Sequence, residues 1–355
     1  MSLELRRSSA PRVSIIIPAT AKPDLLQACL ASLARNLPND IPYETIVVLN
    51  EAKPEPAAQL AKSAIGIEVV SSPVNLGLAG AGNRARALAQ GEYLILLHDD
   101  SEIEPGWLEA LVETADSHPE AGAVFSRVHS FDGSLQTAGG IIWRNATVSH
   151  PWLGGSPPDF IDRVRPIDTP GTSSLLVRAS AWDAVGGLDE RFYPVYFVDL
   201  NLAMSLRQID KVVLCDPRSR TRHHQGGKRS IRFRGFVFYI NRQLFIEKWG
   251  SALESLEPWE ENSQDAIDRA LIRTEAFADQ CRRRVANATK TSTAERPAFD
   301  PAEQEMRCWE KSRDIQTLYA AYLSKMLDQA EAELARHRSP PGQGVWQAGD
   351  FLGRK

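Results

Sequence analysis

The sequence is poor in cysteine, and the few cysteines it has do not form a recognisable framework. Four occur in 355 residues, at Cys29, Cys215, Cys281 and Cys308. They are widely separated and lack the close spacing of metal-binding cysteines. Free thiols of this kind are typical of a reducing compartment, so we expect the protein to be cytoplasmic.

Long apolar runs and an excess of positive charge are also missing. No apolar stretch reaches the roughly 18 residues that a membrane-spanning helix needs. The basic N-terminus lacks the hydrophobic core of a signal peptide. The formal net charge is -4, which argues against nucleic acid as the main partner. The chain is long enough to bury a sizeable core, so we expect one large α/β domain with an appendage.

The first part of the chain alternates between strand and helix patterns. Val13–Pro18 is a β-branched run that stops at proline, and similar runs occur at Glu44–Asn50 and Ile67–Val70. Leucines at helical spacing follow the first run, and a second helix is expected around residues 57–64. This βαβαβ order predicts an α/β fold with a Rossmann-like sheet.

The most informative segment is an apolar run that ends in polar residues. Tyr93–Leu97 is followed by His98, Asp99, Asp100 and Ser101. Such a run predicts a buried central strand, and α/β sheets bind ligands at the carboxyl ends of their strands. Adjacent carboxylates repel unless a cation or a general-acid role compensates. The alternative is a plain cap for the helix that begins near residue 105, and the segment alone leaves both interpretations open.

A glycine-rich segment, Asn75–Arg84, precedes this run. Small residues let the backbone approach a ligand, and the N-terminus of the following helix favours anions. A glycine run alone is more often a plain turn. Its position ahead of the acidic segment strengthens the ligand-binding interpretation.

Taken in order, these segments resemble the inverting nucleotide-sugar glycosyltransferases of family 2, which have the GT-A fold. The resemblance covers residues 12 to about 250 and implies a Rossmann-like mixed sheet flanked by helices. Residues 133–136 and 139–140 are most similar to bacterial rhamnosyltransferases of this family. The motifs that carry the resemblance are Val13–Pro18, Asn75–Gly77 with Asn83, Gly91–Tyr93, His98–Ser101 with Pro105–Leu108, Asp132–Gln136 with Gly139–Gly140, Gly171, Gly186–Phe192, Asp199 and His223–Gly227.

The resemblance also implies a role for individual residues. A divalent metal, Mn²⁺ or Mg²⁺, is expected on Asp100 and His223, with His224 as the fallback ligand. Asp199 matches the general base that deprotonates the acceptor hydroxyl. The positions implied for donor binding are Pro18, Ala19, Thr20, Asn50, Asn75, Gly77, Asn83, His98 and Asp99.

Each of these roles has a plainer alternative when the residues are taken without the resemblance. Adjacent histidines in a basic segment are more often solvent-facing or packed in the core. Asp199 is also suited to cap the amphipathic helix that follows it.

Several positions depart from the family pattern. Leu49, Val198 and Asn201 stand where relatives commonly carry acidic residues, and His98 is the first member of the acidic triplet. These departures favour a catalytically silent GT-A scaffold or binding module as the alternative function. A nucleotidyltransferase is a poorer match, because Pro18–Pro23 is not a glycine-rich phosphate loop.

The chain changes character after Gly250. We expect a catalytic domain over residues 1–250, a helical extension over residues 251–338 and a flexible tail over residues 339–355. The extension predicts one amphipathic helix from Asn262 to Val285 and another that begins at Asp300. Their polar faces carry charges of both signs, so we expect them to pack on the catalytic domain or in a homodimer.

The expected reaction moves a sugar from a UDP- or dTDP-linked donor to a hydroxyl of a glycan or a lipid-linked acceptor in the synthesis of a bacterial surface polysaccharide. An aromatic cluster at Phe233, Phe236, Phe238, Tyr239 and Phe245 is expected to lie mostly in the core. The alternative is a lipid-facing patch, which would allow peripheral contact with the inner face of a membrane.

Overall fold

The computed structural model describes residues 3–19, 23–51, 59–60, 64–150, 162–224, 231–261, 263–287 and 299–337. The chain divides into two compact units, residues 1–312 and residues 313–355. The first unit contains the sheets and most of the helices, and the second contains the greater part of the last helix.

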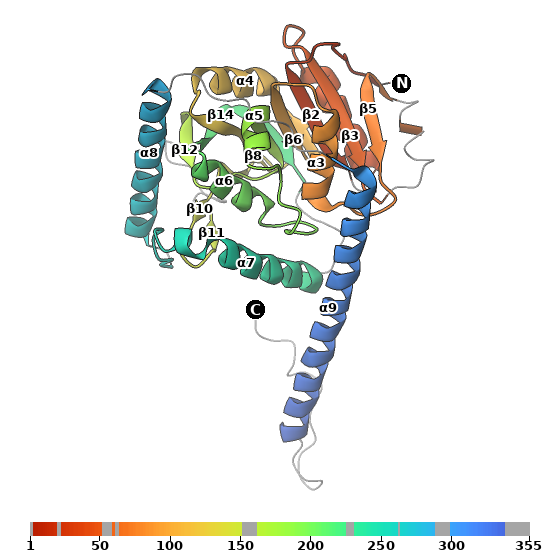
Figure 1. The fold of residues 1–355 in the computed structure, drawn as a ribbon, viewed down its shortest axis with the longest axis vertical. Coiled ribbons are helices and arrows are strands. Elements are labelled where there is room, and N and C mark those ends of the chain that lie inside the picture. The colour runs from red at the N-terminus through yellow and green to blue at the C-terminus, as the bar shows by residue number, and fades with distance from the viewer. Residues whose placement is uncertain are drawn as a thin grey trace. The chain divides into compact units, whose positions relative to one another are not determined.

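The first unit is built on a ten-stranded mixed sheet (Figure 1). Its main path runs in the order β12-β14-β8-β13-β6-β2-β3-β5, with β7 beside β14 and β9 beside β8. The strands are β2 (Val13–Ala19), β3 (Tyr43–Leu49), β5 (Ile67–Ser71), β6 (Tyr93–Leu97), β7 (Ser101–Ile103), β8 (Ala121–His129), β9 (Leu135–Thr137), β12 (Arg165–Ile167), β13 (Ser174–Arg178) and β14 (Val212–His223).

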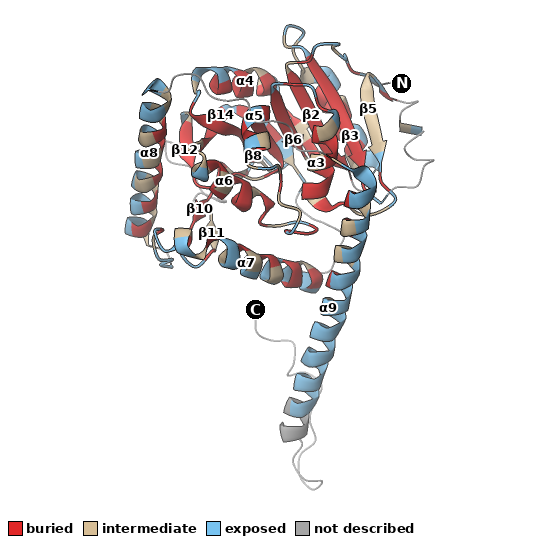
Figure 2. Ribbon diagram, viewed as in Figure 1, coloured by how far each residue is buried: buried red, intermediate tan, exposed pale blue. Residues whose placement is uncertain are grey.

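The β2, β3, β5 and β6 strands pair in parallel, as do β8 and β14. The β13 strand runs antiparallel between β6 and β8. Two short pairs lie outside this sheet, namely β1 (Leu3–Glu4) with β4 (Ala64–Ile65), and β10 (Ile141–Ile142) with β11 (Val148–Ser149). Every residue of β2, β3 and β6 is buried, as expected for central parallel strands covered on both faces (Figure 2).

The helices are α1 (Pro23–Asn36), α3 (Gly77–Leu88), α4 (Trp107–Ser117), α5 (Ala179–Ala184), α6 (Val198–Gln208), α7 (Ile231–Leu253), α8 (Gln264–Asn287) and α9 (Pro301–His337). Helices lie on both faces of the sheet. The alternation of side chains along β2 distinguishes these two faces. Ile15 and Ile17 belong to a core cluster that includes residues of α1, α4 and α8. On the other face, Gly82 of α3 lies against Leu96 of β6.

The strand predictions agree closely with the structure. The runs expected at 13–18, 44–50 and 67–70 correspond to β2, β3 and β5, each within one residue at either end. Most of the helix expected at 57–64 lies outside the described residues, and Ala64 begins β4. The predicted mixed α/β fold with C-terminal helices is confirmed.

The α8 helix, expected as part of the extension, belongs to the first unit and packs against its core. Its buried residues are Ala266, Ala270, Thr274, Ala278 and Cys281, spaced along one face. A buried carboxylate, Asp168, fixes the helix, because it accepts hydrogen bonds from Thr274 Oγ1, Arg273 and Arg207 of α6. The domain boundary at residue 250 stays a prediction. All four cysteines are free and buried.

The second unit is described from Arg313 to the end of α9. This part of the helix leaves a row of apolar side chains exposed to solvent, made up of Leu318, Tyr322, Leu323, Met326 and Leu327. Among the described residues, none of the helices combines the length and the apolar character that crossing a bilayer would require.

Candidate active site

Strand pairing brings three predicted site residues to one edge of the sheet. β6 ends at Leu97, and the chain turns through His98 and Asp100 into β7. β7 then pairs antiparallel with the end of β14, in a register that sets Ser101 opposite His223. Residues that are more than 120 positions apart therefore meet at the carboxyl ends of β6 and β14, where α/β sheets bind ligands.

His98, Asp100 and His223 form what we call the histidine–aspartate cluster. His223 Nε2 lies 3.1 Å from Asp100 Oδ1 and 3.3 Å from His98 Nδ1, and His98 Nδ1 lies 4.0 Å from Asp100 Oδ1. Adjacent ligands of an octahedral ion with bonds of about 2.1 Å lie about 3 Å apart. The spacing of these atoms therefore fits a single divalent cation. Sequence reasoning placed His98 in the donor site and did not consider it as a ligand.

A neighbouring side chain orients the imidazole of His223 toward the cluster. His223 Nδ1 lies 3.1 Å from the amide oxygen of Gln136. An amide oxygen only accepts hydrogen bonds, so Nδ1 carries the proton in this contact, and Nε2 is the ring nitrogen that faces Asp100. Partners of this kind fix the tautomer of metal-binding histidines. Gln136 was part of the recognised motif, but its role was not foreseen.

His98 is held in a similar way. Its Nε2 lies 3.0 Å from Thr172 Oγ1, and its backbone N–H donates to Ser173 O at 3.2 Å. Burial, with a smaller effect of the neighbouring His223, lowers the pKa of His98 to about 4, against the opposing effect of Asp100. His98 is thus neutral near pH 7, which is the form of imidazole that binds metals. Nothing in the sequence marked Thr172 as its partner.

The fallback ligand, His224, points elsewhere. Its ring stacks on Phe131 with 3.8 Å between ring centroids, while its backbone N–H donates to Asp100 O at 3.0 Å. A cavity of about 430 Å³ adjoins Phe131 and is also lined by His129, Arg220 and Arg222. Glu104 and Asp132 also line this cavity, so the edge of the sheet beside the cluster offers space and charges of both signs.

Several predicted donor-binding residues tie the neighbouring strand ends together. Pro18 and Ala19 end β2, and Ala19 O accepts a hydrogen bond of 2.9 Å from the N–H of Asn50. The side-chain oxygen of Asn50 accepts from Leu76 N at 3.1 Å, which anchors the start of α3. Thr20 lies outside the described residues. Asp99 is buried at the end of β6.

Asn75 and Gly77 shape the turn into α3. Asn75 Oδ1 accepts from Gly77 N at 2.9 Å, and Asn75 O accepts from the Tyr193 hydroxyl at 3.0 Å. Gly77 has a φ of 67°, and a Cβ at this position would lie 2.8 Å from Pro194 O. Only glycine permits this approach of α3 to the 193–197 loop without strain.

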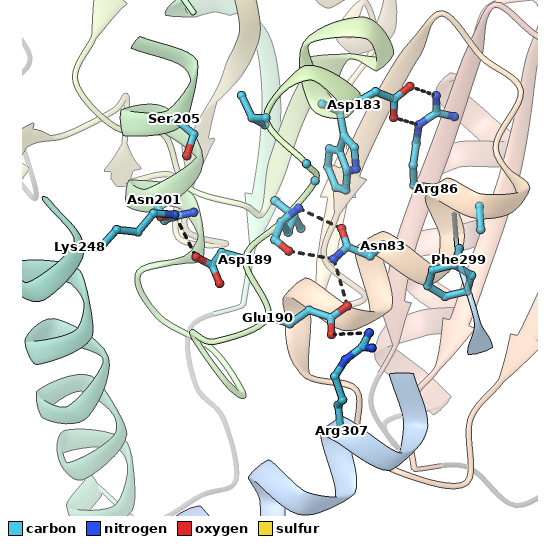
Figure 3. A pocket seen from close by; sticks show the side chains of 16 residues that line it. Asn83, Arg86, Asp183, Asp189, Glu190, Asn201, Ser205, Lys248, Phe299 and Arg307 are labelled. Atoms are coloured by element: carbon cyan, nitrogen blue, oxygen red, sulfur yellow. Dashed lines mark hydrogen bonds and ion pairs between the residues drawn. The ribbon is translucent and has the colours of Figure 1, made fainter. Parts of the chain in front are cut away.

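Asn83, the remaining donor-binding prediction, lies at a different place. Its amide bonds both backbone groups of Leu188, at 2.8 and 2.9 Å, and Glu190 Oε1 at 3.1 Å. These residues line a cavity of about 390 Å³ between α3, α6 and α7, which we call the paired-charge pocket (Figure 3). The structure does not bring Asn83 into the histidine–aspartate cluster.

The charged residues that line this pocket are already paired. Arg86 and Asp183 form a buried two-point ion pair, with distances of 2.9 and 2.6 Å. Although burial raises the pKa of Asp189, hydrogen bonds from Arg191 and Lys248 hold it well below its usual range. Figure 3 shows Glu190 between Asn83 and Arg307. The pocket has little charge left for a ligand.

Asp199 lies in the first turn of α6. The residues before it, Tyr196 and Phe197, have φ angles of 72° and 64°, a strained conformation for bulky side chains. The amide of Asn241, on α7, holds this loop by donating to Val195 O at 2.8 Å and Tyr196 O at 3.3 Å. Sequence reasoning missed Asn241, because its partners are backbone carbonyls.

Burial raises the pKa of Asp199 to about 6, and hydrogen bonds from the backbone of Leu200 and Asp199 oppose this effect only in part. A carboxylate with a pKa near the working pH is a better proton acceptor than an ordinary aspartate. The two departures nearest to it have structural roles. Val198 is buried, and Asn201 Oδ1 accepts from Lys248 at 2.8 Å and Trp249 at 3.1 Å.

Comparison with known proteins identifies the part of the chain that carries this site. Residues 14–174 match the profile of the family described as Glycosyl transferase family 2. The chain contains a family 2 glycosyltransferase domain. This finding confirms the family that the ordered motifs indicated.

Two curated proteins are similar in sequence to part of this chain. The O-antigen biosynthesis protein RfbC of Myxococcus xanthus is 29% identical over 232 residues, which is 62% of this chain but 18% of that protein. The N-acetylglucosaminyl-diphospho-decaprenol L-rhamnosyltransferase of Mycobacterium tuberculosis (strain CDC 1551 / Oshkosh) is 26% identical over 230 residues, 56% of this chain and 72% of that protein. The chain thus spans less than a fifth of the length of the first relative.

Among solved structures, GalNAc-T7 with UDP, GalNAc and Mn2+ has a similar fold. The TM-score is 0.51 at 13% identity, over 79% of this chain and 58% of that one. At this identity the likeness concerns the fold alone. It supports the GT-A arrangement that the sequence motifs implied.

Proposed function

We propose that this chain is a metal-dependent inverting glycosyltransferase. The observation that carries the proposal is the histidine–aspartate cluster at the carboxyl end of β6, within a family 2 glycosyltransferase domain. When bound there, a divalent cation would neutralise the negative charge that develops on a nucleoside-diphosphate leaving group. Asp100, His223 and His98 would hold the cation.

The chemistry of these ligands favours Mn²⁺ over Mg²⁺. Mg²⁺ prefers oxygen ligands and keeps several of its waters, whereas imidazole nitrogen is a common ligand of transition-metal ions. The cluster supplies two imidazole nitrogens and one carboxylate. We therefore assign Mn²⁺ as the preferred ion.

Asp199 acts as the general base in this proposal. Inversion requires the acceptor hydroxyl to lose its proton as it attacks the sugar carbon from the side opposite the leaving group. The raised pKa of Asp199 suits it to take that proton near pH 7. The contacts of Asn241 with the preceding loop hold the carboxylate in position.

For substrates, we propose a UDP- or dTDP-linked sugar as donor, with dTDP-rhamnose as one candidate. The acceptor is a hydroxyl of a glycan or a lipid-linked molecule used for a bacterial surface polysaccharide. Support comes from the names of the relatives, one of which acts on a diphospho-decaprenol acceptor and another in O-antigen biosynthesis. The donor would lie along the ends of β2, β3 and β6, near Ala19, Asn50 and Asp99.

The proposal is tested by nucleotide binding, because a ligand that binds only the folded state raises stability by mass action. Thermal unfolding is measured with UDP, dTDP and GDP, each with Mn²⁺, Mg²⁺ or a chelator. We expect one nucleotide to stabilise the protein in a Mn²⁺-dependent way, by about 2.7 kcal/mol at a hundred times its Kd.

Two neighbouring histidines provide a matched pair of variants. His223→Ala should abolish the metal-dependent stabilisation, whereas His224→Ala should keep it, since the His224 ring stacks on Phe131 outside the cluster. Equal behaviour of the two variants would contradict the metal assignment. If no nucleotide stabilised the wild-type protein, the catalytically silent module would become the better account.

We also propose that the second unit carries a homodimer contact. Leu318, Tyr322, Leu323, Met326 and Leu327 are exposed along α9, and the helix from Arg313 carries charges of both signs, which suits a protein partner more than a lipid surface. Sedimentation should show a dimer for the wild type and a monomer for Leu323→Ser with Leu327→Ser. A monomeric wild type would disprove the contact.

A further inference from the structure

The α7 helix presents an apolar, aromatic face to solvent at its N-terminal half. Ile231, Phe238 and Tyr239 are 80%, 44% and 61% exposed. They recur at a spacing of seven to eight residues and therefore lie on one side of the helix. Val195, in the loop packed against α7, is also exposed at 37%. Large apolar residues gathered in this way commonly mark an interaction surface.

The N-terminal half of α7 itself carries charge of one sign, with Arg232 exposed and Arg242 donating to Asn145 O. Residues 231–246 include Arg232, Arg234 and Arg242 but no aspartate or glutamate, and the first acidic residue of the helix is Glu247. α9 differs, because its exposed apolar row is accompanied by charges of both signs. Aromatic residues with arginine and without acidic residues are the composition of helices that lie on anionic lipid surfaces.

A neighbouring side of the same helix supports the proposed catalytic base. Asn241 is buried and donates to carbonyl groups of the 193–197 loop. Phe238 joins the two sides, because its ring lies 5.0 Å from the ring of Phe197 and 5.8 Å from that of Tyr196. The exposed face of α7 therefore adjoins the loop that positions Asp199.

We propose that this face of α7 docks on an anionic lipid bilayer and lies in its interfacial region. Docking would place the Asp199 loop next to the headgroups, where the diphosphate and first sugar of a lipid-linked acceptor lie. The cytoplasmic leaflet carries the negative surface charge that the arginines of α7 complement. The choice of a lipid-linked acceptor rests on the proposed function, while the docking itself does not.

The experiment is co-sedimentation of the full chain with vesicles, without nucleotide or acceptor. Vesicles of phosphatidylglycerol and phosphatidylcholine should bind the protein, and vesicles of phosphatidylcholine alone should bind it much more weakly. Ile231→Ser with Tyr239→Ser should remove most of the binding. Arg232→Gln should weaken it by about fivefold, the effect of one basic residue near an anionic surface.

The matched control is Ile272→Ser with Trp259→Ser, which removes two large exposed apolar side chains away from α7. This variant should sediment with anionic vesicles like the wild type. Equal loss in both double variants, or loss on Leu323→Ser with Leu327→Ser and not on the α7 pair, would overturn the proposal. The proposal would also be overturned if the wild type bound neither type of vesicle. The same holds if the α7 face were found only to join two copies of the chain.

Nucleotide binding, measured on the same samples, separates this inference from the proposed function. The α7 pair should bind Mn²⁺ and nucleotide as the wild type does, because Ile231 and Tyr239 lie outside the cluster. Nucleotide binding without vesicle binding would disprove the docking surface but not the proposed transferase function. Vesicle binding without nucleotide binding would support the docking surface and contradict the proposed transferase function.

Discussion

Two polar regions of the first unit differ in how their charged and polar groups are paired. In the paired-charge pocket, Arg86 is bonded to Asp183, and Asp189 to Lys248 and Arg191. In the histidine–aspartate cluster, two imidazole nitrogens and a carboxylate oxygen converge within 4.8 Å of one another. The first arrangement joins donors to acceptors, whereas the second collects electron-pair donors that have more to gain from a cation.

This difference shows why the volume of a cavity is a poor guide to function. The pocket is well formed because ion pairs join α3 to α5 and α7 to Asp189, and the Asn83 amide joins α3 to the loop that contains Asp189. Its residues contribute to folding. The cluster lies at the edge where β6 and β14 end, which is where α/β sheets bind ligands. Substitutions should therefore affect stability in one region and catalysis in the other.

The largest effect on catalysis is expected from Asp199→Asn. The variant should lose about 10²- to 10⁴-fold in kcat, because the amide cannot take the proton from the hydroxyl of the acceptor substrate. The KM for the donor should stay unchanged. The variant should unfold no more easily at pH 7, since the folded protein raises the pKa of this carboxyl and so disfavours its charged form. Steady-state kinetics and thermal unfolding check both halves. Transfer at the wild-type rate would eliminate Asp199 as the base.

The largest effect on stability is expected in the paired-charge pocket, from Asp183→Ala. The change leaves the Arg86 guanidinium buried without its carboxylate and should lower the free energy of unfolding by about 3–5 kcal/mol. Denaturant titration measures this loss. Asp314→Ala, in an exposed pair with Arg313, is the control and should change little. A loss of Mn²⁺ affinity in the folded Asp183→Ala protein would contradict the assignment of stability to the pocket and metal binding to the cluster.

A smaller effect should follow from Gln136→Leu. The substitution removes the acceptor that fixes the His223 tautomer, and metal affinity should fall by about 10- to 100-fold without loss of the fold. Titration with Mn²⁺ measures the change. Gln136→Glu, which keeps an accepting oxygen at this position, should recover much of the affinity. Unaltered binding in the leucine variant would show that the hydrogen bond does not matter.

The smallest effect is the dependence of the rate on pH. Asp199 must be deprotonated to act as a base, and its pKa is raised to about 6. The value of kcat/KM should therefore be constant above pH 7 and fall by about tenfold per pH unit well below pH 6. A rate profile with saturating Mn²⁺ would reveal this. A decline that began only below pH 4 would indicate an ordinary, exposed carboxylate.

The strands could be predicted because buried parallel strands are unbroken apolar runs. β2 and β6 need no tertiary information to be recognised. The cluster is different, because the meeting of Asp100 and His223 depends on the register between β7 and β14. The family resemblance supplied that pair. It did not supply His98 as a third ligand, since the direction of its ring depends on Thr172, in another loop.

The α7 aromatic residues show the same limit. The sequence identified a cluster between residues 233 and 245 but not which members face solvent. Phe233, Phe236 and Phe245 are buried, whereas Phe238 and Tyr239 are exposed. The helix lacks a simple apolar stripe because one side packs on the 193–197 loop and the other is apolar as well. Periodicity alone cannot assign residues to faces in such a helix.

The position of β14 in the sheet has a consequence for how the protein is made. Among the described residues it is the last strand of the sheet along the chain, yet it lies between β12 and β8 and also pairs with β7. Until residues 212–223 leave the ribosome, these strands present open edges, and His98 and Asp100 lack His223, the third member of the cluster. An interrupted chain should therefore be prone to aggregate through β8, and the proposed metal site should form only when the sheet is complete.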